Sequence, residues 1–435
     1  MVEAKTKVKR YDTYKNSSVE WLGEIPEHWE VLANKHIFSL KKNQVGKKSD
    51  DYDLLSLTLK GVVVRNLENG GKFPAEFDTY QEVKKGDFVF CLFDVEETPR
   101  CVGLSDFDGM ITGAYTVMEP NENFDKRFLY HYYLNLDADK RMKPLYTGLR
   151  NTISKDNFFA FKTFVPPLKE QTKIAEFLDD KATKIEDAIA IKEQQINLLK
   201  ERKQILIHKA VTRGLDENVP LKDSGVEWIG EIPEGWEVRR LASFGRFSKG
   251  GGFSKSDLVD TGVSAILYGD IYTKYDISIK KEVRFISIET AKKSIKIDKQ
   301  DLLFTGSGET IEDIGKCVVF LNDKIAYAGG DVIIFKQTEN DSLFLSFTLN
   351  TEGAKFEKAR FSKGEIIVHT YGSKLRNIYI PIPPILEQKE ISEYIEDGCQ
   401  KIETAISLKQ EEIAKLKEYK RSLINDVVTG KVKVS

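Results

Sequence analysis

The chain has 435 residues, a formal net charge of −2, 41% hydrophobic residues and 31% charged residues. This length predicts two to four domains, and the composition is typical of a soluble globular protein. Because the sequence has neither a membrane-spanning apolar run nor a secretory leader, we expect a cytoplasmic protein with no membrane partner. The near-zero charge excludes a general electrostatic attraction to nucleic acids, so any DNA contact must come from local basic surfaces.

The first recognisable element is the motif SSVEWLGEIPEHWEV at residues 17–31, which returns as SGVEWIGEIPEGWEV at residues 224–238. Only three of the fifteen aligned positions differ. The aromatic and Ile-Pro residues of the motif are expected to fix the path of the chain against a domain or a helix, while exposed neighbours remain available to a partner protein. The two copies contain all the tryptophans of the chain: Trp21, Trp29, Trp228 and Trp236.

Each motif is followed by a segment, residues 32–165 or 239–382, and these two segments show little similarity to each other. Both predict an α/β domain, because short apolar runs typical of strands precede one run typical of a helix. In the first segment GDFVFCLF and AYTVMEP predict strands and RFLYHYYLNLDADKRM predicts a helix. In the second, DLLFTGSG and DVIIFK are followed by DSLFLSFTLNTEGAKFEK.

A double proline, at Pro166 and again at Pro383, opens a second repeat that runs without a gap to Thr212 and Thr429. Apolar residues recur in it at steps of three, four and seven, the spacing of one narrow stripe on a charged helix. About forty residues make a helix of roughly 60 Å, which is not stable without a partner stripe. The stripe consists of Ile174, Leu178, Ile185, Ile189, Ile196, Leu199 and Leu206, and of Ile391, Ile395, Ile402, Ile406, Ile413, Leu416 and Leu423.

We expect the two helices to pack on each other through this stripe. Two equivalent halves that pair through the same face are related by a twofold axis, and an axis perpendicular to the helices makes them antiparallel. The alternative is that each helix packs only on its own domain.

The predicted fold is therefore mixed α/β (α+β), with an internal pseudo-twofold duplication. Two α/β domains are separated by two long antiparallel, coiled-coil-like helices. The expected segments are an anchor at 1–31, a first variable domain at 32–165, a central helix at 166–213, a repeated anchor at 214–238, a second variable domain at 239–382 and a C-terminal helix at 383–435.

No catalytic constellation emerges from the sequence. SKGGGFSKS at 248–256 has the composition of a phosphate-binding loop but not its spacing. Asp78, Glu82 and Lys84 weakly resemble a nuclease cluster, and exposed loop charges explain them better. The four cysteines and five histidines do not fall at metal-ligand spacings, so we expect neither a disulfide framework nor a metal site.

Basic, glycine-containing loops with nearby aromatic residues recur in both variable domains. Lysine and arginine neutralise phosphates, arginine also pairs with guanine, and glycine lets a backbone approach a duplex closely. A solvated surface is the simpler explanation for any one of these residues. The DNA-binding candidates are Lys41, Lys42, Lys47, Lys48, Arg141, Lys143, Arg150 and Lys155 in the first domain, and Arg246, Lys249, Lys255, Tyr268, Lys274, Arg360 and Lys363 in the second.

The two duplicated motifs, VEWLGEIPEHWEV with VEWIGEIPEGWEV and VPPLKEQTKIAEFLD with IPPILEQKEISEYIE, resemble the conserved regions of specificity subunits of type I restriction–modification systems. The resemblance covers nearly the whole chain, and the order of the motifs is highly specific. The variable domains match least, as expected if they bind a different DNA sequence.

This resemblance implies a non-catalytic subunit whose two target-recognition domains each bind half of a bipartite, asymmetric site in double-stranded DNA. The helix pair would set the spacer between the half-sites. The implied protein partners are two modification subunits, which methylate adenine with S-adenosylmethionine, and restriction subunits, which translocate and cut DNA with ATP. S-adenosylmethionine, ATP and magnesium would be bound by those partners, and no cofactor by this chain.

Two other classes of function are alternatives to a DNA-specificity subunit. A stand-alone nuclease would need a clustered acidic site. A coiled-coil scaffold without DNA specificity would leave two dissimilar domains on identical mounts unexplained.

Overall fold

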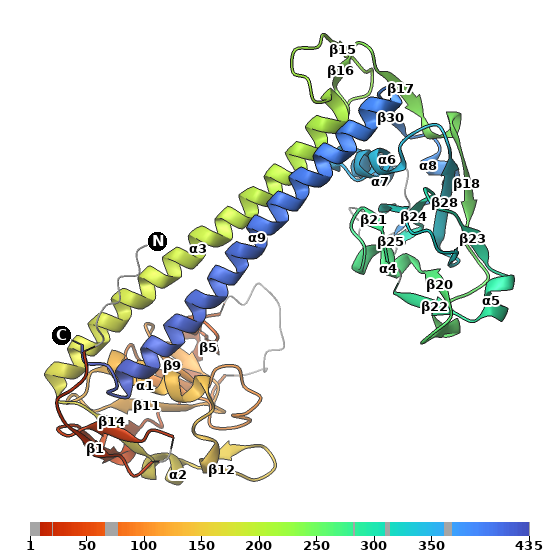
Figure 1. Cartoon of the computed structure of the whole chain (residues 1–435). Coiled ribbons are helices and arrows are strands. Elements are labelled where there is room, and N and C mark those ends of the chain that lie inside the picture. The colour runs from red at the N-terminus through yellow and green to blue at the C-terminus, as the bar shows by residue number, and fades with distance from the viewer. Residues whose placement is uncertain are drawn as a thin grey trace. The chain divides into compact units, whose positions relative to one another are not determined.

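Figure 1 shows the computed structural model of the chain, in which residues 9–19, 21–65, 77–281, 283–308, 314–360 and 368–434 are described. The chain divides into two compact units. The first combines residues 1–192 with 411–435, and the second consists of residues 193–410. In the described part of the chain, no helix is both long and apolar enough to cross a membrane.

A four-stranded antiparallel sheet, in the order β4-β11-β8-β9, forms the centre of the first unit. Helix α1 (Lys126–Ala138) packs against this sheet and buries Phe128, Tyr132 and Tyr133. Smaller antiparallel pairs surround it: β1 with β2, β3 with β14, β5 with β6, β7 with β10 and β12 with β13. The strands are β1 (Tyr14–Asn16), β2 (Glu24–Pro26), β3 (Glu30–Ala33), β4 (Phe38–Leu40), β5 (Leu55–Thr58), β6 (Gly61–Val64), β7 (Gln81–Val83), β8 (Phe88–Phe90), β9 (Val102–Leu104), β10 (Gly109–Ile111), β11 (Thr116–Pro120), β12 (Tyr146–Thr147), β13 (Thr152–Ile153) and β14 (Lys162–Val165), with the short helix α2 (Lys155–Ala160) before β14.

The second unit contains two five-stranded sheets, in the orders β18-β28-β24-β26-β21 and β19-β22-β20-β27-β23. Its smaller pairs are β15 with β16, β17 with β30 and β25 with β29. The strands are β15 (Leu221–Asp223), β16 (Glu231–Pro233), β17 (Glu237–Arg240), β18 (Gly245–Lys249), β19 (Leu258–Val259), β20 (Val263–Ile266), β21 (Ser278–Ile279), β22 (Arg284–Ile286), β23 (Ile295–Ile297), β24 (Leu302–Thr305), β25 (Ser307–Gly308), β26 (Cys317–Phe320), β27 (Ala326–Ala328), β28 (Val332–Gln337), β29 (Val368–His369) and β30 (Tyr379–Ile382). The short helices are α4 (Tyr268–Thr273), α5 (Ile288–Lys292), α6 (Ser342–Leu349), α7 (Glu352–Arg360) and α8 (Gly372–Leu375).

The two units share one plan beneath these differences. The order β4-β11-β8-β9 of the first sheet corresponds to β18-β28-β24-β26 of the second, and a capped helix follows each sheet, α1 in one unit and α6 in the other. A pair of strands next to the double proline closes each domain, β3 with β14 and β17 with β30. What lies between these shared elements differs, since only the second unit carries another five-stranded sheet among the described residues.

The long helices are α3 (Leu168–Arg213) and α9 (Ile385–Val428), and each contributes one part to each unit. Every one of the fourteen predicted stripe residues is buried or half-buried, and equivalent positions of the two copies have the same burial class. Ile174 and Leu178 also join the core of the first unit, as Ile391 and Ile395 join that of the second. The expected mixed α/β fold with two long helices is confirmed, while the six segment boundaries remain a prediction.

Ion pairs between the helices establish their direction within each unit. In the first unit Lys192 pairs with Glu412 (2.5 Å) and Glu186 pairs with Lys420. Residues nearer the start of α3 therefore contact residues nearer the end of α9. In the second unit Lys203 pairs with Glu403 (2.8 Å), and Leu206 lies beside Gly398. The helices are therefore antiparallel in both units.

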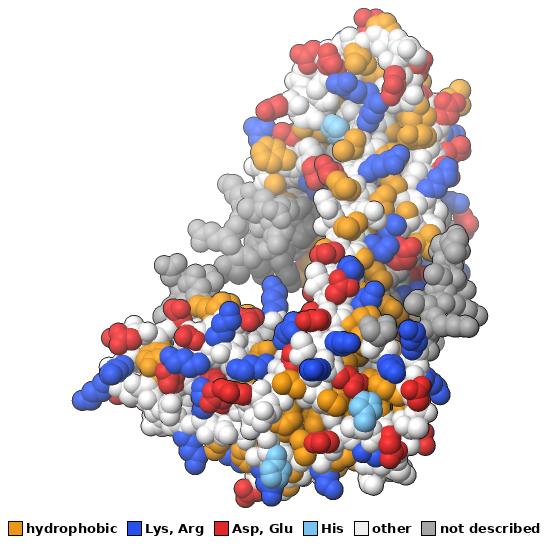
Figure 2. All heavy atoms as spheres, turned by 90° about the vertical axis from the view of Figure 1, so that its left-hand side faces the viewer, with side chains coloured by type: hydrophobic (Ala, Val, Ile, Leu, Met, Phe, Trp, Pro, Cys, Tyr) orange, Lys and Arg blue, Asp and Glu red, His pale blue; other side chains and the backbone are white. Residues whose placement is uncertain are grey.

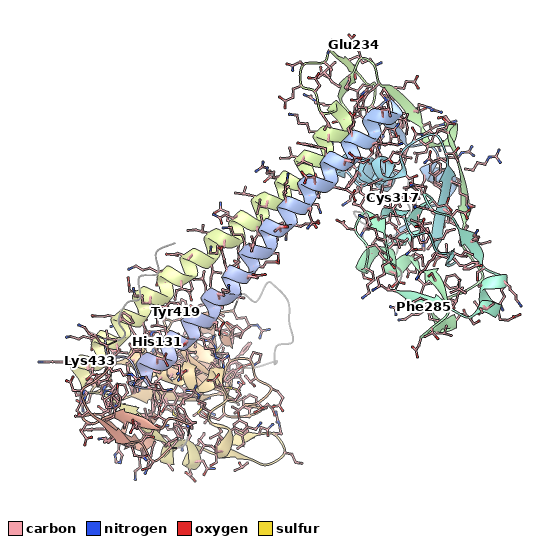
Figure 3. The ribbon with its side chains drawn as sticks, viewed as in Figure 1. His131, Glu234, Phe285, Cys317, Tyr419 and Lys433 are labelled. Atoms are coloured by element: carbon pink, nitrogen blue, oxygen red, sulfur yellow. The ribbon has the colours of Figure 1, made fainter. Side chains whose placement is uncertain are left out.

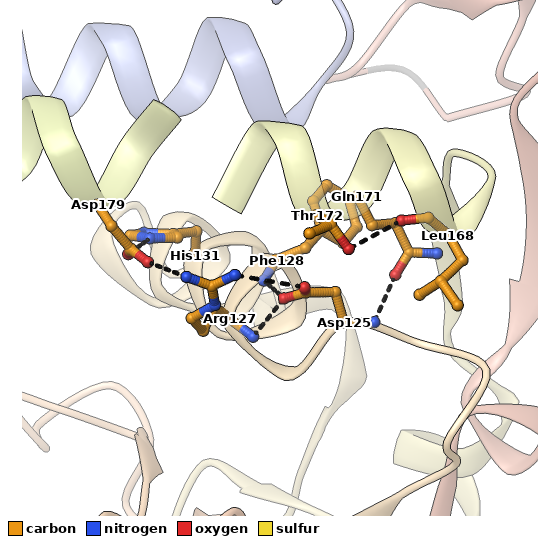
Figure 4. A network of polar contacts seen from close by, with 8 residues as sticks. All are labelled: Asp125, Arg127, Phe128, His131, Leu168, Gln171, Thr172 and Asp179. Atoms are coloured by element: carbon orange, nitrogen blue, oxygen red, sulfur yellow. Dashed lines mark hydrogen bonds and ion pairs between the residues drawn. The ribbon is translucent and has the colours of Figure 1, made fainter. Parts of the chain in front are cut away.

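Each double-proline motif joins its long helix to its own domain through a glutamine. The Gln171 side chain donates to the Pro166 carbonyl (2.8 Å) and accepts from the Asp125 backbone N–H (2.9 Å). Asp125 in turn caps α1 by accepting from the N–H groups of Arg127 and Phe128 (Figure 4). In the second copy Gln388 donates to the Pro383 carbonyl (2.8 Å) and accepts from the N–H of Asp341, which caps α6.

The glutamate before each glutamine holds the anchor motif. The buried indole of Trp29 donates to Glu170 (3.2 Å), and that of Trp236 donates to Glu387 (3.0 Å). The glycine that follows the end of the other long helix packs against the same indole and has a positive φ. Gly430, after α9, lies against Trp29, and Gly214, after α3, lies against Trp236. A Cβ at Gly430 would lie 2.3 Å from the Pro26 Cδ, so only glycine fits there.

In the first unit a further polar contact joins α1 to α3. His131 Nε2 lies 2.8 Å from Asp179 Oδ1, and Arg127 donates to the other Asp179 oxygen (3.1 Å) (Figure 4). The hydrogen bond with His131 lowers the pKa of the Asp179 carboxyl, and Arg127 contributes to the same effect.

The helix stripe yields a first prediction. Ile402→Ala removes a side chain that is 8% exposed and should lower the free energy of unfolding by about 2–4 kcal/mol, because burial is lost and a cavity is left. Leu408→Ala on the same helix is the matched control, since Leu408 is 55% exposed and its loss should change stability by less than about 0.5 kcal/mol. Urea unfolding measures both, and equal effects would contradict the assignment of the stripe.

The contact between α1 and α3 yields a second, pH-dependent prediction. A carboxyl whose pKa is lowered by folding stabilises the protein above its unfolded pKa, and this contribution is lost as the pH falls through the folded value. Asp179→Asn should therefore lower the unfolding free energy at pH 7 by up to about 1 kcal/mol, since the site is partly exposed. The difference from the unchanged protein should shrink as the pH falls below the unfolded pKa of about 4 and vanish below the still lower folded pKa. A difference that keeps its full size from pH 7 down to about pH 2 in urea unfolding would refute this account.

Candidate nucleic-acid interface

Two hollows on the surface of the second unit bring basic and aromatic side chains together. The larger has a volume of about 740 Å³ and the smaller about 470 Å³, and Asp331 lines both. The larger is lined by Ala242, Gly245, Arg246, Phe247, Ser248, Lys249, Gly306, Ser307, Asp331, Ile333, His369, Thr370, Tyr371, Gly372, Ser373 and Arg376. The smaller is lined by Phe253, Ser254, Lys255, Leu258, Leu267, Tyr268, Gly269, Asp270, Thr273, Arg284, Gly330 and Asp331.

Edge strand β18 forms one wall of the larger hollow. Its register with β28 pairs Arg246 with Lys336 and Phe247 with Phe335. Phe247 packs on the Phe335 ring, with centroids 4.5 Å apart, while Arg246 and Lys249 remain exposed. Alternation along the strand thus places Phe247 and Arg246 on opposite faces of the sheet.

Most cations of the two hollows lack strong acidic partners. Arg246, Lys255 and Arg376 form no ion pair with any residue in the described ranges, and Lys249 approaches Asp331 only to 3.8 Å. Arg284 differs, because it pairs with the buried carboxylate of Asp270 (3.2 Å). Unpaired, exposed cations in a concave surface are available to neutralise phosphates.

Aromatic and hydrogen-bonding groups lie among these cations. The Tyr371 and Tyr268 side chains are exposed, at 60% and 39%. His369 Nδ1 lies 3.0 Å from the Ser307 hydroxyl, so the pair presents a donor or an acceptor according to the tautomer of the ring. Such a surface offers stacking faces and polar groups to an extended, negatively charged ligand.

The glycine run at 250–252 does not serve the purpose that its composition suggested. A Cβ at Gly250 would lie 2.2 Å from the Gly329 carbonyl oxygen, and one at Gly252 would lie 2.4 Å from that of Lys293. The close approach that these glycines permit is therefore to the backbone of the same unit. Of the three, only Gly251 could carry a Cβ without a clash, since the nearest atom, Ile295 Cγ1, would lie 4.0 Å away.

Four of the seven candidates from the second variable domain line the two hollows. Arg246 and Lys249 line the larger, and Lys255 and Tyr268 the smaller. Lys274 is exposed after α4 and lines neither hollow, and Arg360 pairs with Glu357 (2.8 Å) within α7. Lys363 lies outside the described residues.

In the first unit, two of the DNA-binding candidates make structural contacts within the unit. Lys41 binds the buried Asp87 carboxylate through two contacts of 2.9 Å, and in the second unit Asp301, at the matching place before β24, binds Lys336 of β28 (3.2 Å). Arg141 stacks on Trp21 at 4.6 Å and donates to Asn425 of α9 (2.8 Å). Both residues thus have structural roles, and neither is a free cation.

The other candidates of the first unit lie at the surface. Lys143 pairs with Glu96 (3.2 Å), and Arg150 forms a two-point ion pair with Asp94, whose pKa it lowers. The remaining four are exposed and have no ion-pair partner among the described residues: Lys42, Lys47, Lys48 and Lys155.

Sequence reasoning missed several residues of the larger hollow. Tyr371 and Arg376 belong to HTYGSKLRN at 369–377, which has the same mixture of basic, aromatic and glycine residues as the segments predicted to bind DNA. That composition was a usable signal. Asp331 carried no such signal, because an acidic residue in a turn is ordinary and only the fold places it among cations.

One buried cation of the second unit has a structural position. Lys358 donates to the carbonyls of Gly315 (2.6 Å) and Leu349 (2.7 Å), and burial lowers its pKa to about 7. The neighbouring Cys317, labelled in Figure 3, lies in the same buried region, where burial raises its pKa to about 12. Lys358 thus joins α7 to the end of α6 and to the loop before β26.

Opposite charges are interspersed over much of the surface. On the face shown in Figure 2, lysine and arginine side chains stand next to aspartate and glutamate side chains. Exposed ion pairs of this kind are screened and contribute little. The hollows differ from such areas because three cations that have no acidic partner in the described part of the chain line a concave surface there.

Comparison with known proteins identifies the family. The model of the type I restriction modification DNA specificity domain matches residues 100–201 and 233–418. The chain is 25% identical over 338 residues to the type I restriction enzyme MjaVIII specificity subunit of Methanocaldococcus jannaschii, covering 75% of each protein. It is 24% identical over 442 residues to the putative MjaX specificity subunit of the same organism, covering 95% of this chain and 96% of the relative.

The fold agrees with this assignment. A chain from a solved type I R-M system superposes with a TM-score of 0.69 at 14% identity, covering 93% of this chain and 98% of its own length. The duplicated frame, the paired long helices and the family match lead to one conclusion: the chain belongs to the specificity subunits of type I restriction–modification systems.

Proposed function

We propose that this chain selects the DNA site of a type I restriction–modification complex, with each variable domain binding one half of a bipartite, asymmetric sequence. The observation that carries the proposal is a repeated frame with unlike surfaces. The two units share a strand order and both motifs, yet their inserted elements differ. Two equivalent frames that carry different recognition surfaces favour an asymmetric DNA site.

The chemistry is assigned to partner subunits, since specificity subunits are generally non-catalytic. Two modification subunits would dock on the two equivalent parts of the frame and methylate adenine with S-adenosylmethionine. Restriction subunits would add ATP-dependent translocation and cleavage. The pseudo-twofold repeat supports a pair of equivalent docking sites, because equal surfaces bind equal partners.

The helix pair would set the spacer between the half-sites. Helix α3 has 46 residues, which corresponds to about 69 Å along a straight helix. One turn of B-DNA is about 34 Å, so a helix of this length suits half-sites one to two turns apart. The antiparallel pairing of α3 and α9 through their apolar stripes supports this role, because a paired helix is stiffer than a single one.

The proposal makes a direct prediction. Co-expression with the cognate modification subunit in a methylation-free host should produce N6-methyladenine in one bipartite motif with a fixed gap, and single-molecule sequencing would record it. Exchange of residues 32–165 for the same segment of another specificity subunit should change one half of the motif and leave the other half and the gap unchanged. A stable complex that methylates no motif would contradict the recognition role, and failure to associate would contradict docking.

The unpaired cations of the hollows make a second prediction. In the complex with modification subunits, Arg246→Ala and Lys255→Ala should each weaken DNA binding at every sequence. Each should also reduce the slope of log affinity against log salt by about one, because a phosphate contact is lost. Lys299→Ala is the control, since that exposed lysine already pairs with Asp323 (2.7 Å) and lines neither hollow. Equal slopes for all three variants would remove these hollows from the interface.

A further inference from the structure

Asp331 is an acidic residue placed where a DNA-binding surface should exclude one. It lies in the turn between β27 and β28 and lines both hollows of the second unit. The cations Arg246, Lys249 and Arg376 line the larger hollow together with it. The other aspartate in the linings, Asp270, is buried and paired with Arg284. Asp331 is therefore the exposed carboxylate shared by two basic surfaces.

Backbone hydrogen bonds fix the main chain that carries this carboxylate. The Asp331 carbonyl accepts from the Gly306 N–H (2.9 Å), and the next residue, Val332, donates to Gly329 (3.1 Å) and accepts from Gly250 (2.8 Å). Strand β28 begins at that point in the middle of its sheet. The side chain thus extends from a rigid turn, as a group that determines specificity requires.

No contact within the unit accounts for the side chain itself. It accepts no hydrogen bond from any residue in the described ranges, and its single ion pair, with Lys249, is 3.8 Å long with both side chains more than half exposed. A pair of this kind contributes almost nothing to stability. Near a phosphate the same carboxylate would be repelled, so a DNA-binding surface retains it at a cost unless it binds a donor.

Bases present such donors in the major groove. The exocyclic amino groups of cytosine N4 and adenine N6 lie at the base edges, and carboxylates accept hydrogen bonds from cytosine N4. A carboxylate accepts and cannot donate when ionised, so it rejects the carbonyl oxygens that guanine and thymine present at the same positions. Cations on either side of it would hold the phosphates of the two strands.

We propose that Asp331 determines specificity in the half-site bound by the second unit, by accepting a hydrogen bond from the exocyclic amino group of one cytosine or adenine. This inference rests on the proposed function. It assigns one position of the recognition sequence to one side chain, and the motif itself would show which of the two bases carries the amino group.

The test uses the complete complex with modification subunits. Methylation rates are measured on duplexes in which each position of the half-site is replaced by each of the other bases, for the unchanged protein, Asp331→Ala and Asp331→Asn. Asp323→Asn is the matched control, because Asp323 is an exposed aspartate of the same unit that lines neither hollow. Folding is checked by the melting temperature, which should be unchanged for all three variants since both side chains are exposed.

The expected result is confined to one position. With Asp331→Ala, the preference for cytosine or adenine there should fall about ten- to a hundredfold, while all other positions keep their selectivity. With Asp331→Asn, guanine or thymine should become tolerated at that position, because an amide also donates. Asp323→Asn should behave as the unchanged protein.

Two results would overturn the inference while leaving the proposed function intact. One is an unchanged selectivity profile in Asp331→Ala. The other is a uniform gain in binding at all sequences, which would mean that Asp331 only repels phosphates. If the unchanged complex itself shows no preferred sequence, the proposed function fails, and the inference fails with it.

Discussion

The structure depends on one constraint: a charged helix with a narrow apolar stripe cannot remain folded in water without a second stripe. Helices α3 and α9 meet this constraint for each other, and the equivalent positions of the two stripes are buried to the same degree. The pairing also explains the duplication. A chain that contains two copies of one helix can satisfy both with one interface, and each unit then receives the beginning of one helix and the end of the other.

The repeated motifs connect this pair of helices to the two domains. One glutamate and one glutamine at the start of each long helix bind three separate elements, namely the anchor indole, the double proline and the cap of the helix that follows the central sheet. The second copy repeats the bonds with Trp236, Glu387 and Gln388. Because the glutamine and the indole are buried and the glutamate is half-buried, loss of any one leaves others without partners, which is expensive in a low-dielectric interior. The frame therefore tolerates little change, while the inserted strands and loops remain free to vary.

The sequence predicts more of the fold than of the candidate DNA interface. The stripe and the helix after each sheet follow from local periodicity, which survives in a single chain without tertiary information. The interface does not. Lys41 and Lys42 are adjacent and identical in type, yet Lys41 binds a buried aspartate 46 residues away and Lys42 is exposed. Only the packing of the sheet distinguishes them.

The same reasoning explains why an acidic residue was overlooked. A search for basic residues assumes that DNA attracts cations, and this holds for phosphates but not for base edges. In a protein whose charges nearly cancel, affinity has to come from cations without acidic partners, and here three of them line the two hollows. A carboxylate that persists among them lowers affinity for every sequence. It is useful only if it lowers affinity less for the correct sequence than for the others, which is the physical meaning of specificity.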